Sequence, residues 1–125
     1  MTEADVIAHW QKGSQNELQS AKLLNEGCQY PAALFHRHLA VEKALKALYM
    51  EEHRREAPLT HDLLHIALQG KHEWTNKEKE FLADLNEYAV AARYDDPLWA
   101  EREATAESVT NWIRAIEAFL SSLFS

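Results

Sequence analysis

The chain has 125 residues, of which 46% are apolar and 26% charged, the proportions of an ordinary globular protein. This length can bury a core without metals or disulfides, and the single cysteine, Cys28, excludes an internal disulfide and favours a reducing, cytoplasmic setting. The net charge is −7, and most of the acidic excess falls in residues 61–125, which disfavours a nonspecific nucleic-acid binder because such proteins need a basic face.

No apolar stretch approaches the ~20 residues that a membrane span requires. The N-terminus also lacks the basic region and apolar run of a signal peptide. We therefore expect no membrane segment and a cytoplasmic location.

Helical spacing of apolar residues runs along nearly the whole chain, without strand-like alternation. The first helix is predicted over residues 2–26, with Gly27 as its stop. The second is predicted over residues 30–54, with Pro31 in its first turn. Because this second helix is apolar on two sides, it is expected to lie at the centre of the fold.

Three further helices follow. A short helix is predicted over residues 61–68, capped by Thr60. Thr75 and Glu78 form a capping box that begins the fourth helix, and the last helix is expected from about Thr105. Four long helices and one short helix predict an all-α up-down bundle, a single domain over residues 1–125.

Motifs of several enzyme classes are absent: the sequence has no glycine-rich phosphate loop, no Cys-x-x-Cys and no His-Glu-x-x-His. We therefore expect no cofactor. Trp74 and Trp99 lie in or near loops, and the sequence leaves open whether they form an association surface or pack beneath those loops.

Histidines offer one metal hypothesis. His61 and His65 are four residues apart, which can hold a metal on one helix face. No third ligand is evident, so we predict no metal site. His38 lies on an apolar face and is expected to be a hydrogen-bonded core residue.

Charged residues of the second helix allow two interpretations. Glu42 and Lys46 are four apart and can form a solvated pair, while Lys43 points elsewhere. Alternatively, Glu42 continues an apolar stripe, is partly buried and needs a cation, for which Arg93 is a candidate.

The segment from Arg93 to Asp96 precedes the last helix. Arg93 offers a planar set of donors for a phosphate or carboxylate, and Tyr94 a ring that can stack on a base. Asp95 and Asp96 can accept from a ribose or hold a divalent ion. By itself, this segment is more typical of a turn.

Five segments together carry a resemblance: residues 30–35 (YPAALF), 39–48 (LAVEKALKAL), 60–63 (THDL), 85–88 (LNEY) and 92–95 (ARYD). In order and spacing they resemble the HEPN family, the higher eukaryotes and prokaryotes nucleotide-binding domains. The resemblance implies an up-down bundle of four or five helices that is often dimeric. Many prokaryotic members are encoded beside a minimal nucleotidyltransferase, as a toxin–antitoxin or nucleotide-handling pair, and others are metal-independent endoribonucleases.

The ribonuclease members resemble one another in an Arg-x(4–6)-His motif before the last helix. Here the corresponding positions 98–100 hold Leu, Trp and Ala, and no histidine follows His72. Arg55 and His61 fit the spacing but lie between the second and third helices. Without a general acid or base near Arg93, activation of an RNA 2′-hydroxyl is hard to build.

The resemblance therefore implies a non-catalytic module that binds an ATP-like nucleotide, partners a minimal nucleotidyltransferase and forms a homodimer. The candidate ligand residues are Arg93, Tyr94, Asp95, Glu42 and Lys43.

Two alternatives remain open. The first is a degenerate ribonuclease that uses Arg93 or the pair Arg55 and His61, although RNA is the less favoured ligand. The second is a purely structural interaction domain, in which Arg93 only forms an ion pair with Glu42 or Asp95.

Overall fold

The computed structural model describes residues 2–93 and 105–124, and only the backbone of residues 88–93, 106 and 124. The described residues form helices and no strand. The helices are α1 (Glu3–Glu26), α2 (Tyr30–His53), α3 (Leu63–Gln69), α4 (Asn76–Arg93) and α6 (Ala106–Phe124). This arrangement confirms the predicted all-α fold of four long helices and one short helix. No helix in the described residues is long and apolar enough to cross a membrane.

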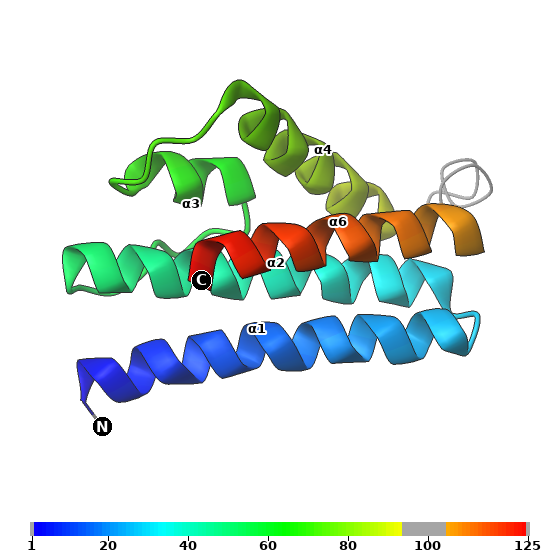
Figure 1. Ribbon diagram of the computed structural model, residues 1–125, viewed down its shortest axis with the longest axis horizontal. Coiled ribbons are helices and arrows are strands. Elements are labelled where there is room, and N and C mark those ends of the chain that lie inside the picture. Colours follow the sequence, from blue (N-terminus) through cyan, green and yellow to red (C-terminus); the bar gives the residue numbers. More distant parts are fainter. Residues whose placement is uncertain (1, 94–104, 125) are drawn as a thin grey trace.

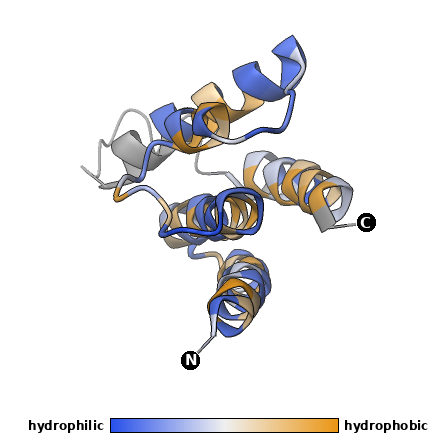
Figure 2. Cartoon of the chain, turned by 90° about the vertical axis from the view of Figure 1, so that its left-hand side faces the viewer, coloured by the Kyte–Doolittle hydropathy of each residue, from blue (hydrophilic) through white to orange (hydrophobic). Residues whose placement is uncertain are grey.

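Helix α2 lies at the centre of the bundle and contacts α1, α3, α4 and α6 (Figure 1). Viewed along the long helices, α1 lies on one side of α2, whereas α3 and α4 lie on the other, with α6 beside α2 (Figure 2). Successive long helices run in alternating directions (Figure 1). The predicted up-down topology and the central position of α2 are therefore both confirmed.

Small and branched side chains explain why α2 can be surrounded. Its alanines allow neighbouring helices to approach closely, and its larger apolar side chains fill the remaining space. These alanines are Ala33, Ala40, Ala44 and Ala47, each fully buried. Val41 and Leu45 are buried beside them, and each buried side chain of this size contributes about 1.5–3 kcal/mol.

Side-chain caps fix the first turns of α1 and α4. Thr2 Oγ1 accepts a hydrogen bond from the Asp5 amide at 3.1 Å, and the Asp5 carboxylate accepts from the Thr2 amide at 3.0 Å. The same reciprocal pair joins Thr75 and Glu78 at 2.9 and 3.1 Å. The predicted capping box of the fourth helix is therefore confirmed.

The start of the short helix differs from the prediction. Asp62 caps α3 in place of Thr60, and the helix begins two residues later than expected. The Asp62 carboxylate accepts from the His65 amide at 3.1 Å and from the Asn86 side chain at 2.8 Å. Asp62 is the better cap because a carboxylate can serve both donors at once.

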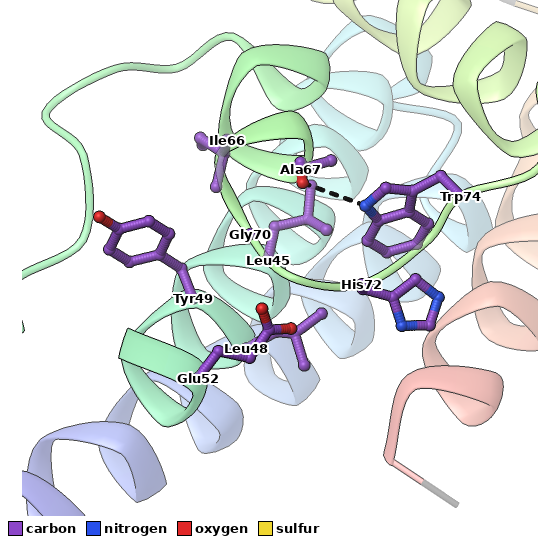
Figure 3. A pocket seen from close by; sticks show the side chains of 9 residues that line it. All are labelled: Leu45, Leu48, Tyr49, Glu52, Ile66, Ala67, Gly70, His72 and Trp74. Carbon is purple, nitrogen blue, oxygen red and sulfur yellow. Dashed lines mark hydrogen bonds between the residues drawn. The ribbon is translucent and has the colours of Figure 1, made fainter. Parts of the chain in front are cut away.

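Trp74 packs beneath the connection between α3 and α4. Its side chain is buried, and its Nε1 donates to the Ala67 carbonyl at 3.1 Å (Figure 3). The ring stacks on Phe119 of α6 with centroids 5.7 Å apart. The neighbouring cavity has a volume of about 10 Å³, room for one water at most. Trp74 therefore serves local packing, whereas Trp99 lies outside the described residues.

Candidate functional site

A polar cluster with three buried members lies along α2, and we call it the Glu42 cluster. It comprises His38, Glu42 and Lys46 of α2, together with His61 from the segment between α2 and α3. Nζ of Lys46 lies 3.3 Å from Oε2 of Glu42, and Nδ1 of His61 lies 2.9 Å from Oε1. His38 approaches Oε1 with its Nε2 at 3.7 Å.

Glu42 is 4% exposed, so the interpretation of a solvated pair with Lys46 is wrong and the interpretation of a buried carboxylate is confirmed. Lys46 and His61 supply the cationic and hydrogen-bonding partners that such a carboxylate needs. Arg93, the partner considered from the sequence, has its side chain outside the described residues.

The environment of Glu42 keeps it ionised. Burial by itself raises the pKa of Glu42, but contacts with His38 and His61 and the charge of Lys46 outweigh burial and lower this pKa to about 2. At neutral pH the side chain is therefore a carboxylate, which only accepts hydrogen bonds. The hydrogen between Glu42 and His61 accordingly belongs to Nδ1 of His61.

The cluster reaches solvent through His61, whose side chain is 65% exposed. On the α1 side, Nζ of Lys46 lies 5.5 Å from the ring centroid of Trp10. His61 precedes α3, so it does not share a helix face with His65 as the metal hypothesis required. Among the described residues, no three His, Cys, Asp or Glu side chains are placed to hold a metal ion.

Lys43 belongs to a different contact. Its Nζ donates to Oε1 of Glu17 on α1 at 2.9 Å, and Nδ1 of His36 lies 2.6 Å from Oε2 of the same carboxylate. Burial raises the pKa of Glu17, but the bonds from Lys43 and His36 outweigh it, and the pKa is lowered. Gly13 leaves room for the lysine, since a Cβ there would lie 3.1 Å from Cδ of Lys43. The structure therefore does not bring Lys43 to Glu42.

The remaining candidates lie at the end of α4. Arg93 is the last residue of this helix, and Figure 1 shows that this end lies toward the beginning of α6. The side chain of Arg93 and the whole of Tyr94, Asp95 and Asp96 lie outside the described residues.

One buried cation was missed from the sequence. Arg37 of α2 is 1% exposed, and its Cζ lies 4.7 Å from the ring centroid of Trp112 on α6. The available signal was its position, three residues after Leu34 and four before Val41, on an apolar stripe of the helix. This signal is weak, because arginine is mostly exposed in proteins and is buried only when it is paired.

The fold and the cluster define the chain as an all-α helical bundle with a polar centre on its middle helix. A family model described as the HEPN domain matches residues 7–123. The chain therefore belongs to the HEPN domain family, as the resemblance implied, and this membership supports a nucleotide-binding or ribonuclease-like module. No curated protein and no solved structure matches the chain.

Proposed function

We propose that the chain is a non-catalytic HEPN module that binds an ATP-like nucleotide and partners a minimal nucleotidyltransferase in a toxin–antitoxin-like pair. The observation that supports this is the family match over residues 7–123, which includes Arg93. The sequence carries no histidine at positions 98–100 for a ribonuclease motif built on this arginine. Binding is therefore favoured over cleavage at this position.

In this proposal Arg93 holds a phosphate, and Tyr94 stacks on the base or hydrogen-bonds to it. Asp95 and Glu42 orient Arg93 or contact the sugar. An arginine fork suits a phosphate because it donates two parallel hydrogen bonds. Glu42 and Lys43 already hold ion pairs inside the bundle. A direct contact of either residue with the nucleotide would therefore compete with these ion pairs.

Calorimetric titration with ATP, GTP and UTP tests the binding. The chain is titrated alone and together with the proposed nucleotidyltransferase partner. We expect saturable binding of at least one nucleotide at ~1 mM or below, which corresponds to about 4 kcal/mol of binding free energy. No binding heat in either sample would contradict the proposal.

The proposed assembly is a single-domain homodimer that binds the nucleotidyltransferase in the cytoplasm. Light scattering of the purified chain should give twice the mass of one chain, and co-expression should yield a stable complex that survives gel filtration. A monomer at all concentrations would remove the homodimer from the proposal, and separate elution of the two proteins would remove the partner.

A second function is favoured by one contact. A metal-independent ribonuclease needs a general base, and His61 is an exposed imidazole held through Nδ1 by the buried carboxylate of Glu42 at 2.9 Å. Arg55 lies on the same connecting segment, where its Nε donates to the Tyr49 hydroxyl at 2.9 Å. The pair Arg55 and His61 would then replace the motif missing after Arg93.

An RNA cleavage assay in EDTA tests this second function. Activity should survive the chelator and fall by roughly 10²–10⁴-fold in His61→Ala. His65→Ala, which removes another exposed histidine four residues away, is the matched control and should keep the activity. Absence of cleavage by the wild type, or equal activity in both variants, would rule the second function out.

A further inference from the structure

His61 is held at two points by α2. Its backbone carbonyl accepts a hydrogen bond from Nε2 of His38 at 3.1 Å, and its Nδ1 donates to Glu42 at 2.9 Å. His38 and Glu42 lie one helical turn apart, and each is 4% exposed. Two buried residues of the central helix thus fix the main chain and the side chain of one exposed histidine.

These contacts assign the ring hydrogens. A carbonyl oxygen only accepts, so Nε2 of His38 carries the hydrogen in its bond to His61. The carboxylate of Glu42 also only accepts, so Nδ1 of His61 carries the other hydrogen. In neutral His61, Nε2 is therefore an unprotonated acceptor. It belongs to a side chain that is 65% exposed.

The polar contacts of His38 point to a specific task. Its second ring nitrogen, Nδ1, is buried and has no hydrogen-bond partner among the described residues. Among the described residues, His38 makes polar contacts with the His61 carbonyl and with Glu42. Burying an imidazole with one nitrogen unsatisfied costs free energy. The other ring nitrogen of His38 makes the hydrogen bond that holds the segment carrying His61.

We infer that His61 is a poised proton acceptor and that His38 is its positioning residue. Nε2 of His61 takes a proton from a hydroxyl group or a water molecule, whose oxygen keeps the electron pair of the broken O–H bond and becomes the nucleophile. The carboxylate of Glu42 balances the charge of the resulting imidazolium. This inference goes beyond nucleotide binding at Arg93. If the chain is a ribonuclease, His38 would be the positioning residue of its general base. The experiment that tests the inference requires no ligand.

Nitrogen-15 NMR of the histidine rings tests the assignment on the full chain, at a pH where His61 is neutral. Wild type should show His61 with its hydrogen on Nδ1. His38→Ala removes the bond to the His61 carbonyl, so the segment moves, Nδ1 of His61 loses Glu42 and the ring shifts toward the Nε2–H tautomer, which free histidine prefers. His38→Gln, whose side-chain amide can still donate to the carbonyl, should restore the Nδ1–H form. A residue that only filled space would leave the tautomer unchanged.

Several outcomes would overturn the inference. His61 carrying its hydrogen on Nε2 in the wild type refutes it without any variant. The inference is also refuted if His61 keeps the Nδ1–H tautomer in a folded His38→Ala variant, or if it adopts the Nε2–H tautomer in a folded His38→Gln variant. If His38→Ala does not fold, the His61 tautomers of the wild type and of His38→Gln provide the test. None of these results depends on a nucleotide, so their failure and a failure of the proposed nucleotide binding are distinguishable.

Discussion

Nζ of Lys43 donates to Oε1 of Glu17 at 2.9 Å, so this lysine of α2 links to α1 and does not stand beside Glu42. Both side chains are partly buried. A double-mutant cycle with Lys43→Met and Glu17→Gln should therefore give a coupling free energy of about 0.5–1 kcal/mol in urea unfolding. A coupling of zero would show that the two side chains do not interact in solution.

Leucines with opposite exposure test the packing of α4. Leu82 of α4 is fully buried, whereas Leu23 of α1 is 57% exposed. Leu82→Ala should lower the free energy of unfolding by roughly 2–5 kcal/mol because it leaves a cavity in the core. Leu23→Ala, the same substitution on another helix, should stay within about 0.5 kcal/mol of the wild type. Equal losses in the two variants would contradict the packing of α4 on the bundle.

The pKa of Glu42 predicts how stability depends on pH. The folded-state pKa is lowered from 4.5 to about 2, so the stabilisation is fully present above pH 4.5 and is lost as the pH falls toward 2. The loss over this window amounts to roughly 3 kcal/mol. Urea unfolding at several pH values should show an acid loss in the wild type that is smaller by about this amount in Glu42→Gln, where the contribution of Glu17 remains.

Glu80→Gln on the exposed side of α4 is the control for this pH series. Because that carboxylate is exposed, its variant should keep the steep acid dependence of the wild type. A Glu42→Gln variant with the same acid dependence as Glu80→Gln would show that Glu42 is not held ionised by its neighbours.

The cap of α3 gives a fourth prediction. Asp62→Ala removes the acceptor for the His65 amide and for the Asn86 side chain, and should cost about 0.5–2 kcal/mol in urea unfolding. Asp62→Asn keeps an acceptor and should lose less. Thr60→Ala should cost less than Asp62→Ala, and the reverse order would restore Thr60 as the effective cap.

Local patterns predicted most of the fold, since helix periodicity and end signals act over a few residues. The predicted range of residues 30–54 agrees with α2 (Tyr30–His53), and Thr75 with Glu78 marks the start of α4. The start of α3 was missed although the capping bond of Asp62, to the His65 amide, is local. Its second bond, to Asn86, joins a residue far along the chain that only the folded bundle brings close.

The site was less predictable because its contacts join distant residues. The position of Glu42 on an apolar stripe indicated burial, but its partnership with His61 arises only when the segment after α2 folds back along this helix. Likewise, no local pattern assigns Lys43 to Glu17 of α1. Arg37 was overlooked because a single arginine on an apolar stripe gives only a weak signal.

The central claim, nucleotide binding through Arg93, is tested most directly by titrating the preferred nucleotide into wild type, Arg93→Ala and Arg114→Ala. Arg114 is an exposed arginine of α6 and serves as the matched control. A thermal melt of each variant accompanies the titration. We predict that Arg93→Ala melts like the wild type and binds at least tenfold more weakly, a loss of about 1.4 kcal/mol, while Arg114→Ala binds normally. Unchanged binding by a folded Arg93→Ala would contradict the account, and unfolding of this variant would instead favour a structural role for Arg93.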